Sequence, residues 1–288
     1  MWRKYARLIA LSHTVFAFPF ALWGFILGIQ EVKYAGWKNK LLWVVVAVVS
    51  ARTAALAFNR YADWRIDAQN PRTAQREIPQ GQVKPAEALG LTIASTLLFL
   101  ISSWMLSPLC LLLAPLALLI LLGYSYTKRF TFMSHYVLGI ALGLAPIGAY
   151  VAVVEAFAYP LWLIGSAVML WVGGFDILYA LQDEEFDRNY GLHSIPARLG
   201  ERWARRISLL SHIIAVSILA WVGLILHRQT VGDLLYWIGW SAFSAFVFYQ
   251  HWVSLDKSQI NRAFFTYNGL ASVVFGSLAI SSLLLRAY

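Results

Sequence analysis

Nine apolar stretches, each close to the length of a membrane-spanning helix, follow one another along this 288-residue chain. A helix needs roughly 20 apolar residues to cross the hydrocarbon core of a bilayer. Only 13% of the residues are charged, whereas soluble domains contain roughly 25%. No Ser/Gly-rich linker divides the chain, so we expect one all-α, polytopic membrane bundle of about nine transmembrane helices that forms a single domain over residues 1–288. The expected spans are 8–29, 41–58, 89–106, 109–124, 135–154, 160–180, 207–226, 231–250 and 264–285.

The formal net charge of +9 would suggest a nucleic-acid partner in a soluble protein, but membrane topology explains its distribution better. With the N-terminus inside the cell, 17 of the 23 Lys and Arg residues fall on the cytoplasmic side. Arg52 lies within a span, and the opposite side holds Lys33, Lys38, Lys40, Arg228 and Arg286. This bias follows the positive-inside rule. We expect an inner-membrane protein with cytoplasmic loops, surrounded by membrane lipid and without a nucleic-acid partner.

Two aspartate motifs with the same internal spacing open the two long polar stretches, 59–88 and 181–206: Asn59-x3-Asp63-x3-Asp67 and Asp183-x3-Asp187. Residues four apart share one face of a helix, so each motif places carboxylates side by side. Both motifs are expected at helix C-termini, where carboxylates are unfavourable unless a cation offsets them. Oxygen ligands of this kind suit Mg²⁺, which commonly bridges carboxylates to substrate phosphates. Solvated charges at helix ends are the alternative for a single pair, but two pairs favour a metal–diphosphate site.

The two motifs also occupy matching positions in the chain. Asp63 and Asp183 are 120 residues apart, as are Asp67 and Asp187, and an Ile-Pro step follows each motif. This spacing suggests a weak internal duplication, with both loops capping one shared cavity.

Two ionisable residues lie deeper in the expected spans. Arg52 precedes Asn59 by seven residues, and Asp176 precedes Asp183 by seven, so each lies on the stripe of its motif. An ionisable residue within a membrane helix is a candidate for function. The alternatives are a structural ion pair between Arg52 and Asp176, or an ion path through a transporter or channel. A transporter would not require Mg²⁺-dependent release of diphosphate.

Basic residues near the motifs are candidates for binding the leaving diphosphate. Arg72, Arg76 and Lys128 are favoured because they closely follow the first motif or the end of the fourth expected span. For Arg129 we prefer a contribution to topology alone, and the same holds for Arg202, Arg205 and Arg206.

Three segments together resemble the UbiA superfamily of intramembrane prenyltransferases. They are Asn59-Arg-Tyr-Ala-Asp63-Trp-Arg-Ile-Asp67 with Arg72, Arg76 and Pro79 after it; Tyr124 with Lys128-Arg129; and Asp176-x2-Tyr179-x3-Asp183-x3-Asp187. The resemblance implies transfer of a polyprenyl group from an all-trans polyprenyl diphosphate to an aromatic acceptor, with Mg²⁺ as cofactor. It places Asn59, Asp63, Asp67, Asp183 and Asp187 on metal–diphosphate positions, Arg72, Arg76 and Lys128 near the leaving group, and Asp176 in the cavity wall.

From the residues and the resemblance together, we expect four residues to be catalytic: Asp63, Asp183, Arg52 and Asp176. Two positions depart from the family pattern, because Arg60 stands where many members carry aspartate and Trp64 where many carry arginine.

The acceptor implied by the resemblance is a hydroxylated aromatic acid. Our first choice is 4-hydroxybenzoate, as in ubiquinone biosynthesis. The alternative is a dihydroxynaphthoate in the futalosine route to menaquinone, because two runs resemble that branch: His13-Thr-Val-Phe-Ala-Phe-Pro-Phe20 and Ala51-Arg-Thr-Ala-Ala-Leu-Ala-Phe-Asn-Arg60.

Overall fold

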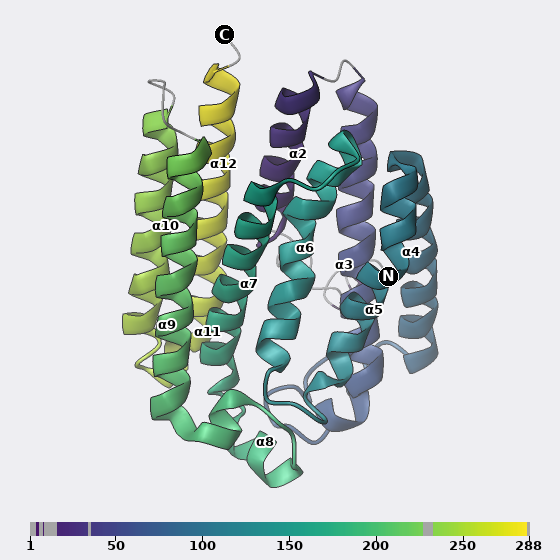
Figure 1. Ribbon diagram of the computed structural model, residues 1–288. Helices are drawn as coiled ribbons and strands as arrows, with labels where there is room; N and C mark the ends of the chain where they lie inside the picture. Colours follow the sequence, from purple (N-terminus) through teal and green to yellow (C-terminus); the bar gives the residue numbers. More distant parts are fainter. Residues whose placement is uncertain (1–3, 6–7, 9–15, 34–35, 227–232, 287–288) are drawn as a thin grey trace.

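The computed structural model describes residues 4–5, 8, 16–33, 36–226 and 233–286, and every element in these ranges is helical. The long helices lie side by side in one bundle (Figure 1). They are α2 (Phe18–Val32), α3 (Trp37–Asp67), α4 (Pro85–Leu106), α5 (Pro108–Thr127), α6 (Ser134–Val154), α7 (Tyr159–Ala180), α9 (Ile195–Leu226), α10 (Asp233–Val253) and α12 (Asn268–Arg286). The short α8 (Glu184–Tyr190) precedes α9, and α11 (Ile260–Arg262) and a π-helical turn (Ala263–Tyr267) precede α12.

The prediction of an all-α membrane bundle is confirmed. The number of helices that meet the length and hydropathy of a membrane span is smaller than the nine expected. Within the described ranges, seven helical segments are long and apolar enough to cross a membrane: α3, α4, α5, α6, α7, α9 and the segment Lys257–Leu285. Helix α2 has 15 residues, and residues 9–15 of the expected first span lie outside the described residues. Helix α10 has 21 residues, but its polar residues Asp233, Gln250 and His251, together with its Trp and Tyr side chains, lower its mean hydropathy.

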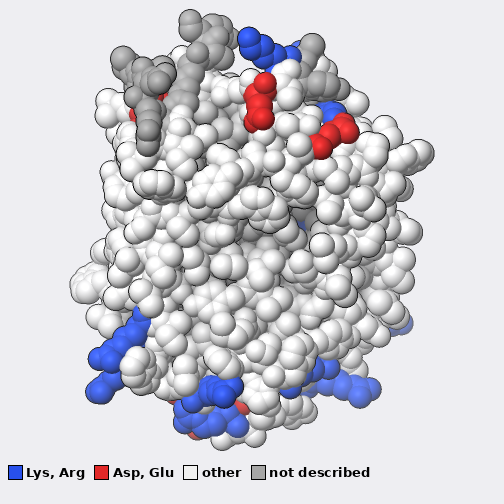
Figure 2. Space-filling model, in the orientation of Figure 1, with Lys and Arg blue, Asp and Glu red and all other residues white. Residues whose placement is uncertain are grey.

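The bundle has an apolar middle zone between two charged ends. On the face shown in Figure 2, Lys and Arg gather at the end that holds α8, and the middle is uncharged apart from a small basic patch inside a hollow. Leucines on α5 point outward from this middle zone, with Leu112 and Leu119 at least 70% exposed. Such an exposed apolar belt is what a lipid-facing surface requires.

Glycines allow α6 to pack closely against two neighbouring helices. A Cβ atom at Gly139 would lie 2.3 Å from the Met169 carbonyl oxygen of α7, and one at Gly24 of α2 would lie 2.2 Å from the Pro146 oxygen of α6. Small residues at helix contacts permit such backbone approach in membrane bundles. Helix α6 is therefore held tightly on the α2 and α7 sides.

The two sides of the bundle differ in how they are filled. Aromatic rings pack solidly around α7, α10 and α12, where Trp171 contacts Phe20 and Phe243 at ring centroid distances of 5.6 and 5.4 Å. On the other side, α3, α4, α5 and α6 enclose a cavity of about 300 Å³. The cavity lies on the side of the bundle that carries the first aspartate motif.

Candidate active site

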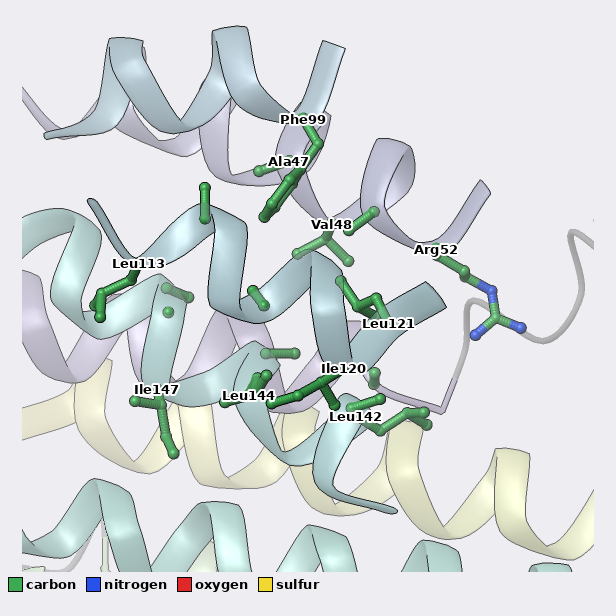
Figure 3. Close-up of a pocket in the computed structure, with 18 of the residues that line it drawn as sticks. Ala47, Val48, Arg52, Phe99, Leu113, Ile120, Leu121, Leu142, Leu144 and Ile147 are labelled. Atoms are coloured by element: carbon green, nitrogen blue, oxygen red, sulfur yellow. The ribbon is translucent and has the colours of Figure 1, made fainter. Parts of the chain in front are cut away.

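The cavity wall is almost entirely apolar. Figure 3 shows side chains such as Val48, Leu121 and Ile147 around it, with Arg52 on α3 at one end. Tyr124 of α5 also lines it. The Arg52 Nε atom is buried and donates to no acceptor among the described residues. The cavity therefore combines a long apolar wall with an available cationic group.

The first motif lies on the continuous helix α3, as the spacing predicted. The Asn59 amide donates to Asp63 Oδ2 at 3.1 Å. Arg129, just after α5, donates to Asp63 Oδ1 at 3.0 Å, a contact that the expectation of a contribution to topology did not include. In the loop that follows α3, Arg76 Nη1 donates to both oxygens of Asp67, at 2.7 and 2.8 Å. Each carboxylate of this motif is thus paired with an arginine.

The second motif crosses a break in the backbone, which corrects the expectation of a helix C-terminus. Helix α7 ends at Ala180, and Asp183 stands at the N-cap position of α8. The acidic run Asp183-Glu184-Glu185 favours a helix start, because negative charge is stabilised near a helix N-terminus. The Asp187 amide donates to the Asp183 carbonyl at 2.7 Å, so the two residues still occupy one helical turn. Both are buried, with 4% and 2% exposed.

Asp183 is held by the loop that follows the first motif. Arg72 Nε and Nη2 donate to the two oxygens of Asp183 at 2.8 and 2.5 Å, and Asn70 donates to Oδ1 at 2.8 Å. Arg72 Nη1 also donates to the Tyr179 hydroxyl at 2.8 Å. Burial alone would raise the pKa of Asp183, but its bonds to Arg72 outweigh burial and hold that pKa below the usual value. Burial lowers the pKa of Arg72, but the hydrogen bonds and charge of Asp183 raise it more, so the net shift of the Arg72 pKa is upward.

Asp187 presents an unpaired ligand atom to this region. Its Oδ2 is buried and has no hydrogen-bond partner among the described residues. Lys128, directly after α5, is affected by the charge of this carboxylate. Burial lowers the pKa of Lys128, whereas the negative charges of Asp187, Asp176 and Asp183 raise it. The net shift of the Lys128 pKa is upward. The charges of the second motif therefore favour the charged form of the predicted basic residue.

Asp176 does not form the ion pair with Arg52 that was one alternative. Its Oδ2 instead lies 2.7 Å from Nδ1 of His135, a fully buried residue at the start of α6. Sequence reasoning missed His135, and it missed Asn70 as well. The Asn70-Pro71 turn directly after the first motif was the available signal for Asn70, because Asn and Pro mark turns.

The donor set suits Mg²⁺ in chemistry, although the described residues hold no group of three or more His, Cys, Asp or Glu that could bind a metal alone. Protein sites for Mg²⁺ with a phosphate substrate commonly use only one or two carboxylates, and substrate oxygens and water complete the shell. The unpaired Asp187 oxygen and the carboxylates of the first motif meet that requirement. We conclude that these residues fit a metal that arrives with a diphosphate.

Comparison with known proteins identifies the family. The model of the UbiA prenyltransferase family matches residues 17–272. The chain belongs to this family. Similar curated proteins include the 4-hydroxybenzoate octaprenyltransferases of Aeromonas hydrophila, 31% identical over 244 residues and 84% of each chain, and of Klebsiella pneumoniae, 31% identical over 247 residues and 84% of each chain.

Solved structures of UbiA proteins share the fold. The apo structure of a UbiA homologue from Aeropyrum pernix K1 is 31% identical with a TM-score of 0.82, over 96% of this chain and 98% of that one. A homologue from Archaeoglobus fulgidus bound to DMAPP and Mg²⁺ has a TM-score of 0.71 at 19% identity, over 98% and 99% of the two chains, which shows the fold alone. The predicted family and enzyme class are confirmed: the protein is a multi-pass membrane prenyltransferase. Membership leaves the transporter alternative without support.

Proposed function

We propose that this UbiA protein transfers a polyprenyl group from an all-trans polyprenyl diphosphate to a ring carbon of a hydroxylated aromatic acid of the 4-hydroxybenzoate type, in quinone biosynthesis. The observation that carries the proposal is an apolar cavity whose cationic end, at Arg52, lies on the helix of the first aspartate motif. The curated relatives named 4-hydroxybenzoate octaprenyltransferases support this acceptor.

The cavity offers the environment that a prenyl tail needs. Its α3 wall runs from Val44 to Leu56, which is roughly 18 Å along a helix at 1.5 Å per residue. Burying an isoprenoid chain against such a wall removes apolar surface from water and is favourable. The tail would occupy the membrane half of the site while the diphosphate stays among the polar residues at the helix ends.

The two motifs would hold Mg²⁺ through Asn59, Asp63 and Asp67 on one side and Asp183 and Asp187 on the other. When bound, Mg²⁺ would offset the negative charge that develops on the leaving diphosphate.

Arg72, Arg76 and Lys128 would bind the diphosphate oxygens from the protein side. In the reaction the C–O bond of the prenyl diphosphate breaks and its electron pair leaves with the diphosphate. A ring carbon beside a hydroxyl then forms the new C–C bond and loses its proton. The three cations stabilise the leaving charge because they are positioned before the reaction starts.

Arg52 would bind the carboxylate of the acceptor. An arginine that is buried in a membrane helix without an acceptor for Nε is costly unless a ligand supplies one. A carboxylate matches the guanidinium in charge and in its two-oxygen geometry. Asp176 would accept a hydrogen bond from the acceptor hydroxyl and so raise the electron density of the ring.

Product analysis tests this function. Membranes containing the chain are supplied with Mg²⁺, a polyprenyl diphosphate and either 4-hydroxybenzoate or a dihydroxynaphthoate. Mass spectrometry is expected to detect prenylated hydroxybenzoate. Prenylated naphthoate alone would move the assignment to menaquinone biosynthesis, which the run from Ala51 to Arg60 favours. We also propose an inner-membrane location with the motifs facing the cytoplasm, because most Lys and Arg residues fall at that end.

A further inference from the structure

His135 links Asp176 to the start of helix α9. Its Nδ1 lies 2.7 Å from Asp176 Oδ2, and its Nε2 accepts the backbone N–H of Ile195 at 3.3 Å. The three residues belong to α6, α7 and α9 respectively. The imidazole is fully buried, whereas the Asp176 side chain keeps 19% of its surface exposed. One ring therefore joins three helices at the edge of the proposed site.

The two hydrogen bonds fix the state of the ring. Because Nε2 accepts a hydrogen bond from an amide, it carries no proton, so the proton of the neutral ring is on Nδ1. Nδ1–H then donates to the Asp176 carboxylate. The ring cannot pass a proton onward through Nε2, since that atom already accepts the Ile195 amide. This arrangement suits orientation of Asp176 and excludes His135 as a proton relay.

The same ring connects Asp176 with the segment that carries the second motif. That segment, 181–194, ends where α9 begins at Ile195, and the His193 amide donates to the Lys128 carbonyl at 2.7 Å. The charge of Asp176 also contributes to the field at Lys128. Asp176 is thus placed relative to the proposed diphosphate-binding residues by contacts that pass through His135.

We propose that His135 is a positioning residue for the aromatic acceptor. Its Nδ1–H holds one oxygen of Asp176, and the other, which makes no hydrogen bond among the described residues, is left to accept the hydrogen bond of the acceptor hydroxyl. This inference rests on the proposed function of Asp176. His135 does not touch the substrate.

Two variants of the full-length protein separate the two hydrogen bonds of the ring. In His135→Asn the amide nitrogen takes the place of Nδ1 and keeps the donor for Asp176, but the acceptor for Ile195 is lost. In His135→Gln the amide oxygen reaches the place of Nε2 and keeps the acceptor for Ile195, but the donor for Asp176 is lost. Steady-state kinetics with Mg²⁺, a polyprenyl diphosphate and the acceptor that the wild type prenylates gives the kcat/KM for each substrate.

The proposal predicts that His135→Gln lowers kcat/KM for the acceptor on the order of 10- to 100-fold, because a misplaced reacting group costs up to about that much. KM for the polyprenyl diphosphate should stay unchanged. His135→Asn should retain several times more activity toward the acceptor than His135→Gln. If the ring only anchors α9, the order reverses, and His135→Asn is less active and less heat-stable than His135→Gln.

Asp176→Asn distinguishes the failure of this inference from the failure of the proposed function. A severe defect in Asp176→Asn together with wild-type kinetics in His135→Gln overturns the role of His135 alone. Wild-type kinetics in Asp176→Asn overturns the role of Asp176, and the inference with it. An equal loss in both His135 variants, or a loss confined to the KM of the diphosphate, also contradicts the proposal.

Discussion

The first aspartate motif lies on one unbroken helix, α3, whereas the second crosses the break between α7 and α8. The spacing of the carboxylates is the same in both, yet the structure that holds them differs. In the first motif Asp67 is paired with Arg76, nine residues further along the chain. In the second, Asp183 is paired with Arg72, which lies 111 residues earlier in the chain.

The loop between α3 and α4 explains this difference. In this loop Arg76 forms an ion pair with Asp67 of the preceding helix α3, and Arg72 forms an ion pair with Asp183 of the second motif. A single loop therefore neutralises one carboxylate in each motif. The second motif therefore depends on a segment that is distant in the sequence, so changes in the loop should affect the second motif more than the first.

The largest expected effect comes from removing one carboxylate charge of each motif. Asp183→Asn and Asp63→Asn should each lower turnover on the order of 10²–10³-fold, because each removes a preorganised charge from the proposed diphosphate site. Asp183→Asn should also lower the thermal unfolding midpoint, since it leaves the Arg72 guanidinium without its counter-ion. Prenyl transfer and thermal unfolding of the purified variants measure both effects. Wild-type turnover in the two variants would contradict the assignment of both motifs to the diphosphate site.

The next effect separates the two loop arginines. Arg72→Gln should destabilise the fold by roughly 3 kcal/mol, the lower end of the cost of breaking a buried pair, because Arg72 is itself 26% exposed. Arg76→Gln should cost about 1.5 kcal/mol, the value of hydrogen bonds to a charged group, because a single Arg76 nitrogen donates to Asp67 whereas three nitrogens of Arg72 donate to Asp183 and Tyr179. Denaturation of the two variants side by side measures the difference. An equal loss in both would remove the distinction between the motifs.

A smaller effect is expected at Arg129, the partner of Asp63. The side chain is 39% exposed, and exposed ion pairs contribute little to stability. Arg129→Gln should change stability by about 0.5 kcal/mol at most and turnover by about twofold. Arg198→Gln is a matched control, because Arg198 contacts the Phe132 ring rather than an aspartate. A loss at Arg129 as large as that at Arg72 would place Arg129 in the catalytic machinery.

The smallest effect is a pH dependence of stability that belongs to Asp183. Its pKa is lower in the folded protein than in the unfolded chain because of Arg72, so its contribution is fully present above the unfolded value, about 3.9. The contribution is lost as the pH falls below about 4 toward the folded pKa. The unfolding midpoint of the wild type should therefore fall more steeply below pH 4 than that of Asp183→Asn. Parallel slopes would show that Arg72 does not hold the carboxylate in solution.

Much of the fold could be predicted because its signals are local. Runs of apolar residues predict spans one by one, and the stripe formed by Asn59, Asp63 and Asp67 follows from helical periodicity alone. Helix α10 is not among the clear spans, because polar residues such as Gln250 and His251 add to the modest hydropathy of its Trp and Tyr rings.

The remaining features of the site depend on tertiary contacts. The pairs Arg72–Asp183 and His135–Asp176 join residues 111 and 41 positions apart, and no periodicity relates them. The break before α8 had a local signal in the acidic run from Asp183. That signal was outweighed by the equal spacing of the two motifs, which favoured equal helices. Arg129 had one signal, its place beside Lys128 in a segment that resembles the family, but that place does not reveal its contact with Asp63.

The central claim is that both motifs hold one diphosphate. Equilibrium binding of a prenyl thiodiphosphate, a non-reactive analogue, to the wild type, Asp63→Asn, Asp183→Asn and the double variant in the presence of Mg²⁺ tests it through a double-mutant cycle. One shared site predicts that each single variant weakens binding of the analogue and that the double variant binds it no better than either single variant, the non-additive part of the cycle measuring the coupling between the motifs. Wild-type affinity in either Asp63→Asn or Asp183→Asn would show that only one motif holds the diphosphate and would contradict the account.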